Sequence, residues 1–315
     1  MKSQIENPQS PNYIGVDVSK EKLDLSSQKK VVPNTKRSIN ALLKRLGKTG
    51  VGKVHLVCEA TGGYERLLLE LAHEKGFLVS VINARQIRDF AKSSGRLAKN
   101  DQIDAHVIQH WAETFKPAPQ KAPSENAVRL KALVRRRDCV VKQRTQEKVR
   151  LKKESDSWVI KDLKRSIKFL KDSVDELDSE INKLTTADQK INETRQRLEQ
   201  VPGVAMVVSS TLIAELPELG ELTDKEASSL AGVAPVTRQS GKWEGHSFIA
   251  GGRKRVRRAL YLAAMSSRRY NPILKEFYDR LRGAGKPFKL AITAVMRKLV
   301  CLLNKMLREP EFVLK

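Results

Sequence analysis

Three β-type segments follow one another at the start of this chain, with no room for a helix between them. They are YIGVDV at 13–18, LDLSS at 23–27 and KKVV at 29–32. Connections this short join antiparallel neighbours, because a parallel crossover needs a dozen or more residues. The sequence therefore predicts a sheet whose first strands pair antiparallel.

Helical and β-type segments then alternate as far as residue 115. The helix-periodic segments 38–48, 64–76 and 101–115 are separated by apolar segments at 53–60 and 77–84. Crossovers of this kind join parallel strands. We therefore expect an α/β domain with a mixed sheet, in the element order of a ribonuclease H-like fold.

A change in composition follows this α/β region. Residues 116–126 form a polar stretch with three prolines, which reads as a linker or a boundary. Residues 126–200 hold almost no Gly or Pro and are helix-forming throughout. Within them an apolar residue recurs at alternating three- and four-residue steps, as in the a/d seam of a coiled coil. The seam consists of Ile167, Leu170, Val174, Leu177, Ile181 and Leu184.

The C-terminal third is expected to be mainly helical. The Pro-Gly turn and apolar run at 201–216 fit either a helix-hairpin-helix element that meets a phosphate or an ordinary joint between helices. Residues 229–252 are Gly-rich and read as irregular. A strongly basic helix is expected at 253–270, and an amphipathic core helix at 286–307.

The charge of the chain limits its partners. Sixty Lys and Arg face 36 Asp and Glu, a formal net charge of +24. Such a chain attracts polyanions, with nucleic acid first and an anionic membrane surface second. No apolar run is long enough for a transmembrane helix, and the N-terminus lacks the apolar stretch of a signal peptide. The three cysteines form no paired motif, so we expect a reducing cytoplasm.

Four acidic residues stand where two metal ions can be held. Asp17 lies in the first β-type segment, and Glu59 ends the segment 53–60. Neighbouring strands of a ribonuclease H-like sheet bring such carboxylates to one cleft at the strand ends. Asp101 and Asp104 are three apart and share one helix face, which would pack over that cleft. Like charges this close need compensation, which Mg²⁺ supplies through carboxylate oxygens.

Each acid taken alone also has a structural explanation. Asp17 precedes Ser and Lys and can cap a turn, while Asp101 suits an N-cap and Asp104 a first helical turn. The set is harder to explain this way, because carboxylates at the ends of buried strands are costly without partners. We therefore interpret the four as a metal site.

The acidic motifs GVDVSK, CEATGGYE and KNDQIDA resemble those of the DEDD-type insertion-sequence transposases, the family that includes the Piv DNA invertase. APVTRQSG and RRALYLAA resemble the second, transposase domain of that family. The likeness spans about residues 12–307, with the motifs in the expected order. The resemblance implies a RuvC-like metal-binding domain at 12–125, a helical coiled-coil segment at 126–200 and a C-terminal transposase domain at 201–310.

The resemblance also implies residue roles and partners. It matches the four Mg²⁺-binding acids of the family to the four acids above, with Mn²⁺ as a substitute metal, and its nucleophilic serine to Ser240. Members of this kind work as homo-oligomers, here a dimer or tetramer. They use a noncoding guide RNA encoded by the element to choose donor and target DNA. The implied location is the prokaryotic cytoplasm, at the nucleoid.

Ser240 has a plain alternative, because Ser-Gly is a common turn and a serine hydroxyl needs activation to attack. Ser247 is the nearest competing nucleophile, and Tyr261 and Tyr270 are expected to be packed within their helices. Basic residues around the serine and in the segment 126–168 are expected to contact phosphates; a solvated helix face is the alternative for the basic helix. They are Arg238, Lys242, Arg253, Lys254, Arg255, Arg257, Arg258, Arg135, Arg136 and Arg137.

Three other functions compete with an RNA-guided DNA transposase that works through a serine–phosphate intermediate. The first is a RuvC-like, Mg²⁺-dependent, structure-specific nuclease in which Ser240 is only a turn residue. The second is a sugar-kinase or actin-like ATPase, which shares the opening hairpin; no second Gly-rich phosphate loop follows a later strand. The third is a non-catalytic nucleic-acid-binding protein, which leaves the acids unexplained.

Overall fold

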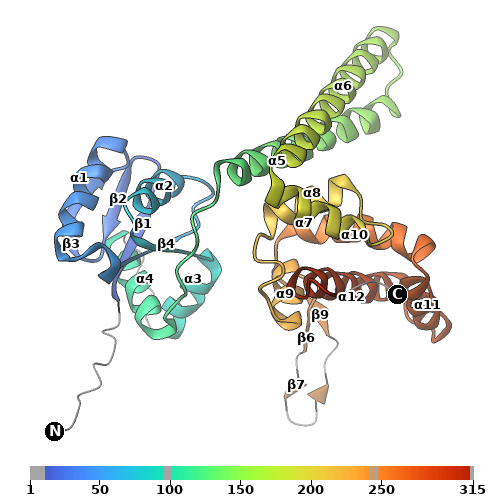
Figure 1. Ribbon diagram of the computed structural model, residues 1–315. Coiled ribbons are helices and arrows are strands. Elements are labelled where there is room, and N and C mark those ends of the chain that lie inside the picture. Colours follow the sequence, from blue (N-terminus) through green and yellow to red (C-terminus); the bar gives the residue numbers. More distant parts are fainter. Residues whose placement is uncertain (1–10, 95–100, 238, 241–242, 245–246, 313–315) are drawn as a thin grey trace. The chain divides into compact units, whose positions relative to one another are not determined.

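The computed structural model describes residues 11–94, 101–237, 239–240, 243–244 and 247–312. The chain divides into two compact units, Met1–Ala122 and Pro123–Lys315 (Figure 1). The division falls inside the proline-containing stretch 116–126. Each unit has its own hydrophobic core, and we describe the two separately.

The first unit is built on a five-stranded mixed sheet. In spatial order the strands are β3, β2, β1, β4 and β5. The first three pair antiparallel, and β1, β4 and β5 pair parallel, which confirms the predicted sheet. Their bounds are β1 Asn12–Val18, β2 Lys22–Leu25, β3 Gln28–Pro33, β4 Val54–Glu59 and β5 Leu78–Ile82.

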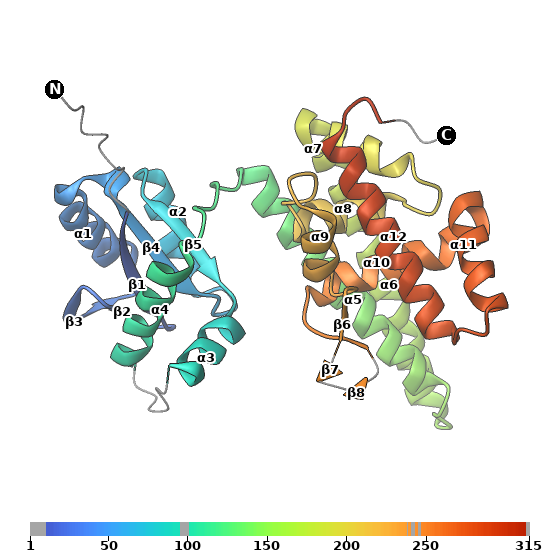
Figure 2. The ribbon, with the colours of Figure 1, turned by 90° about the horizontal axis from the view of Figure 1, so that it is seen from below.

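Helices cover both faces of this sheet (Figure 2). Helices α1 (Lys36–Leu46) and α2 (Arg66–Glu74) pack on the face that carries Ile14 and Val16. Helices α3 (Ala84–Ser93) and α4 (Asp101–Phe115) pack on the face that carries Tyr13 and Val57. Successive residues of a strand point to opposite faces, so β1 contributes to both cores.

In its described residues, the second unit is helical apart from two short strand pairs. Helices α8 to α12 surround one core, and one side of α12 is buried along nearly its whole length. The helix bounds are α5 Glu125–Leu151, α6 Ser157–Ala187, α7 Gln189–Glu199, α8 Met206–Glu215, α9 Asp224–Ala231, α10 Lys254–Tyr270, α11 Pro272–Gly283 and α12 Phe288–Arg308.

The helix-forming segment 126–200 is divided into three helices. Asp156 caps α6 and Asp188 caps α7, each by accepting hydrogen bonds from backbone N–H groups at the helix start. Helix α6 runs back along α5, and Ile181 and Leu184 of the predicted seam share a core with Leu130 and Val134 of α5. The C-terminal end of the predicted seam therefore packs against α5 of the same chain.

The Pro-Gly turn between α7 and α8 is a packed joint. The Pro202 carbonyl accepts a hydrogen bond from the Ser267 hydroxyl of α10 at 2.8 Å, and Val201 and Val204 beside it are buried. This contact favours the ordinary joint over a phosphate-binding element. Across the residues that the structure describes, no helix is both long enough and apolar enough to cross a membrane.

Candidate functional site

Asp17 and Glu59 lie at the same edge of the sheet. In the parallel pair of β1 and β4, Val16 lies opposite Cys58, and the same register continued by one residue sets Asp17 beside Glu59. Both residues are half-buried. Strand alternation places them on the face of Tyr13 and Val57, which α3 and α4 cover.

Helix α4 lies directly on β1 because position 15 is a glycine. A Cβ atom added to Gly15 would stand 2.0 Å from the Ala105 carbonyl oxygen and 2.6 Å from the Gln109 nitrogen. Any side chain there would push the helix off the strand. Asp104 immediately precedes Ala105, so this contact brings the beginning of α4 against the strand that carries Asp17.

The donor set suits a hard cation, because Mg²⁺ and Mn²⁺ prefer carboxylate oxygens. Asp17, Glu59 and Asp104 come from two neighbouring strand ends and the helix that covers them. Asp101 is the first residue of α4, and its side chain lies outside the described part of the structure. Among the side chains that are described, no three His, Cys, Asp or Glu are arranged to hold a metal ion.

A carboxylate that the sequence reasoning missed orders the loop after Glu59. Glu65 accepts hydrogen bonds from the backbone N–H groups of Thr61 at 3.3 Å and Gly63 at 2.8 Å, and from the Thr61 hydroxyl. Burial raises the pKa of Glu65, but these hydrogen bonds outweigh it and hold the pKa below its usual value. The only feature of the sequence that could have indicated this role is the position of Glu65, two residues after the Gly62-Gly63 pair.

Asn34 ties together the two loops that follow β1 and β4. Its side-chain amide donates hydrogen bonds to the carbonyl oxygens of Ser19 at 2.9 Å and Tyr64 at 3.2 Å. Ser19 follows the strand of Asp17, and Tyr64 lies in the loop after Glu59. One side chain therefore joins the connections that leave both acid-bearing strands, and no sequence motif indicated it.

Ser240 lies at the end of a narrow β-ribbon instead of the irregular segment predicted for 229–252. Strand β7 (Gln239–Ser240) pairs antiparallel with β8 (Trp243–Glu244). Nearer the helices, β6 (Pro235–Val236) pairs with β9 (Phe248–Ile249). The ribbon projects from the second unit (Figure 1).

The other residues that the sequence indicated as candidates near the serine are either outside the described residues or exposed. Arg238, Lys242 and His246 lie outside the described residues. Ser247 is exposed beside β9. Tyr261 and Tyr270 are also exposed, by 39% and 70%. The expectation that their helices bury these tyrosines was wrong, because both side chains are open to solvent.

The two legs of the ribbon are clamped where they join the helices. A Cβ atom on Gly252 would lie 2.2 Å from the backbone of Gly232, so only glycine allows this approach. Arg257 donates hydrogen bonds to the carbonyl oxygens of Gly232 at 3.2 Å and Gly251 at 2.9 Å. The ribbon that carries Ser240 is thus fastened to the first turn of α10.

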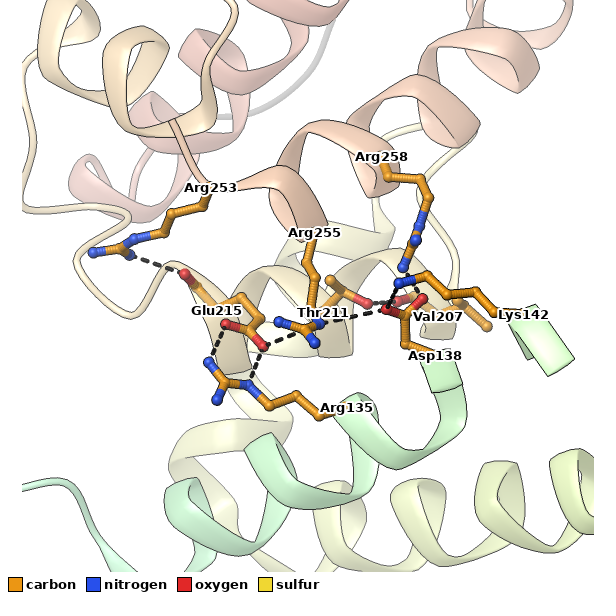
Figure 3. A network of polar contacts seen from close by, with 9 residues as sticks. All are labelled: Arg135, Asp138, Lys142, Val207, Thr211, Glu215, Arg253, Arg255 and Arg258. Atoms are coloured by element: carbon orange, nitrogen blue, oxygen red, sulfur yellow. Dashed lines mark hydrogen bonds and ion pairs between the residues drawn. The ribbon is translucent and has the colours of Figure 1, made fainter. Parts of the chain in front are cut away.

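Most of the arginines expected to bind nucleic acid are held by carboxylates of their own unit. Figure 3 shows three of them with their carboxylate partners: Arg135, Arg255 and Arg258. Arg135 of α5 forms a bidentate pair with Glu215 of α8, at 2.6 and 3.0 Å. Arg253 forms another with Glu218, with both bonds at 2.6 Å. The first pair joins α5 to α8. The second fixes where α10 begins, because Arg253 is the residue that precedes that helix.

Asp138 of α5 gathers a second group of cations. The guanidinium of Arg258 contacts it, Arg255 lies 3.4 Å away and Lys142 3.3 Å away. Arg255 also lies 3.9 Å from Glu215, so it joins the two parts of the network in Figure 3.

Of the other basic residues predicted to contact nucleic acid, one is paired with a carboxylate and two are exposed. Arg137 pairs with Asp178 of α6, at 2.5 and 3.0 Å. Arg136 and Lys254 are exposed. They are the members of the predicted set that remain open to a ligand within the described structure.

Arginine partners lower the pKa of the carboxylates Glu215 and Glu218. Glu215 is only 7% exposed. Burial raises its pKa, but the hydrogen bond and charge of Arg135 outweigh that effect and lower the pKa. Burial and Arg253 oppose each other in the same way at Glu218, where the pKa is also lowered. Removing either acid would leave a charged arginine without its partner.

Two transposase family models match this chain. One, described as a transposase and named for the DEDD transposases of IS110, matches residues 14–156, the part that contains the four acids. The other, described as "Transposase IS116/IS110/IS902 family", matches residues 195–279, the part that contains Ser240.

Curated relatives extend the similarity over almost the whole chain. The "Pilin gene-inverting protein" of Moraxella bovis is 28% identical over 317 residues, which cover 95% of this chain and 97% of the relative. The protein of the same name from Moraxella lacunata matches to the same extent. An "Insertion element IS110 uncharacterized 43.6 kDa protein" of Streptomyces coelicolor is 30% identical over 117 residues, 36% of this chain and 29% of the relative.

Proposed function

Because the chain belongs to the IS116/IS110/IS902 family of transposases, we propose that it is a DNA recombinase of an insertion sequence, which cuts and rejoins DNA strands through a covalent serine–phosphate intermediate. The observation that carries the proposal is that the first unit holds an acidic sheet edge, with Asp17 beside Glu59, and the second unit holds a serine at the end of an anchored ribbon. Donor and target DNA are its substrates, which fits the net charge of +24.

The four acids Asp17, Glu59, Asp101 and Asp104 hold the metal in this proposal. Mg²⁺, or Mn²⁺ in its place, supplies positive charge that offsets the charge of the scissile phosphate. The support is the placement of two carboxylates on neighbouring strand ends and of a third in the helix packed on β1. The loop held by Glu65 and the link made by Asn34 keep the two strand ends in register.

Ser240 is the nucleophile. Its oxygen forms a new bond to phosphorus while the bond from phosphorus to a deoxyribose oxygen breaks; the serine proton passes to solvent and the released oxygen takes one up. A strand-end hydroxyl then attacks the serine–phosphate, which releases Ser240 with a proton and forms a new phosphodiester. The number of phosphorus–oxygen bonds is unchanged, so strand exchange needs no ATP.

We further propose a guide RNA encoded by the element, and a homo-oligomer, dimer or tetramer, at the bacterial nucleoid. A chain with this excess of positive charge suits two nucleic acids at once. Sequencing the nucleic acid that co-purifies with the protein tests the RNA: one discrete noncoding species supports it, and random cellular fragments contradict it.

The experiment that tests the metal centre uses Asp17→Asn and Asp104→Asn. Both variants should keep the circular dichroism spectrum of the wild type and lose Mg²⁺-dependent strand cleavage, because a ligand is lost without a change in shape. Asp89→Asn on the outer side of α3 is the control and should cleave normally. Cleavage that persists in chelator would show that no metal is used.

The runner-up is a RuvC-like, Mg²⁺-dependent, structure-specific nuclease, favoured by the fact that Asp17, Glu59 and both helix acids belong to the first unit alone. In that case water attacks the phosphate and Ser240 is a turn residue. The Ser240→Ala variant separates the two: a nuclease of this type would retain strand cleavage, and the recombinase would lose it.

A further inference from the structure

Two aromatic side chains on α6 are exposed to an unusual degree. Trp158 is 70% exposed and Phe169 is 68% exposed. They are eleven residues apart, close to three full turns, so they share one face of α6 about 16 Å apart along its axis. Asp162 and Arg165 lie between them on that face, so it is not an apolar seam of the kind that packs against a second helix.

The surroundings of the two rings are strongly basic. Residues 142–171, at the far end of the α5–α6 pair, hold eleven Lys and Arg against four Asp and Glu. Lys161, Lys164 and Lys168 are exposed on the same helix, between the two rings along its length.

The acidic side chains of residues 142–171 have hydrogen-bond or ion-pair partners within that same stretch. Asp156 caps α6, Glu154 accepts hydrogen bonds from two backbone N–H groups, and Glu147 pairs with Arg150 at 2.8 Å. Asp162 pairs with Arg165, and exposed pairs of this kind are weak enough to exchange for a phosphate. The far end of the pair therefore presents rings together with an excess of positive charge.

This end of the helix pair also extends away from the helices around α12. Figure 1 shows the far parts of α5 and α6 projecting beyond the rest of the second unit. The described cores of the unit include neither Trp158 nor Phe169. The exposure of the rings is thus not explained by packing within the unit.

We propose that this face of α6 binds single-stranded nucleic acid, with unpaired bases stacked on Trp158 and Phe169 and phosphates held by Lys161, Lys164 and Lys168. Aromatic rings among cations are how proteins hold single strands without reading sequence, since every base has a flat face to stack. A second copy of this chain fits less well, because identical ends carry the same charge. The inference rests on the proposed function in that the substrate is nucleic acid.

The test is binding of labelled oligothymidylate, oligouridylate and a mixed-sequence DNA duplex to the full-length protein, followed by fluorescence anisotropy. Trp158→Ala and Phe169→Ala should each weaken single-strand binding about tenfold and leave duplex binding nearly unchanged. Trp158→Phe should restore most of the affinity, because it keeps a ring. Val149→Ala, which trims a 50% exposed side chain of α5, is the matched control and should bind normally.

Single-strand affinity equal to that of the wild type in both alanine variants would overturn the proposal. So would a change of oligomeric state in Trp158→Ala with oligonucleotide binding intact, which would assign the face to a second copy. A larger loss with oligouridylate than with oligothymidylate supports the proposal and identifies RNA as the strand; the reverse identifies DNA. Binding is measured without cleavage, so this test is independent of the serine mechanism. If the alanine variants lose affinity but Ser240 forms no adduct, the binding role of the α6 face is supported and the serine mechanism is not. If Ser240 forms an adduct and the alanine variants keep their affinity, only the binding role of the α6 face is contradicted.

Discussion

At the scale of single residues, Glu65 shows how a carboxylate can serve the site without touching substrate. Its side chain is the acceptor that closes the loop after Glu59, and its pKa is lowered by Thr61 and Gly63 despite partial burial. A group whose folded pKa is lowered contributes stability that is present above its unfolded pKa, about 4.3 for glutamate. That contribution is lost as the pH falls through the folded pKa.

We therefore predict that Glu65→Gln removes part of the acid sensitivity of the first unit. Between about pH 5 and pH 3, the melting temperature of the wild type should fall more steeply than that of the variant. Glu70→Gln, at an exposed position on α2, the helix that follows Glu65, should follow the wild type. Thermal unfolding by circular dichroism checks this, and parallel curves for all three proteins would contradict it.

At the scale of elements, the contact between β1 and α4 sets where the acids of the helix lie. Gly15→Ala should force α4 away from the strand, because its Cβ would overlap the Ala105 carbonyl. We expect a loss of unfolding free energy of about 1–3 kcal/mol, together with a higher Mg²⁺ requirement for cleavage. Gly52→Ala adds the same atom where nothing lies within 4 Å, and it should change neither quantity. Equal behaviour of the two variants would show that the close approach has no effect.

A second prediction at this scale concerns the network of Figure 3. Glu215→Gln should lower the unfolding free energy of the second unit by about 3 kcal/mol, because it leaves Arg135 without its buried counter-charge. Glu180→Gln, which removes an exposed partner of Arg129 and Lys183, should have little effect. Denaturant unfolding measures both, and a small effect of Glu215→Gln would mean that the arginines are not held there in solution.

For the whole molecule, periodicity predicted the first unit well, because the patterns that identify strands and helices involve residues close together in the sequence. Strand alternation and helix spacing indicated the mixed sheet, and the helix expected at 101–115 is α4. The ribbon was missed because its strands are two residues long and leave no alternation to detect. The carboxylate partners of the arginines were also missed: Glu215 is 80 residues from Arg135, and Glu218 is 35 from Arg253. Sequence shows the charge of an arginine but not which distant acid neutralises it.

The central claim for the whole molecule is that Ser240 becomes covalently joined to DNA with the help of the acidic sheet edge. The direct measurement is to trap the protein on labelled substrate DNA, digest both, and locate the attached nucleotide by mass spectrometry. We predict one adduct, on Ser240, that forms with wild type and Ser247→Ala but not with Ser240→Ala or Asp17→Asn. An adduct on Ser247, Tyr261 or Tyr270, or cleavage with no adduct at all, would contradict it.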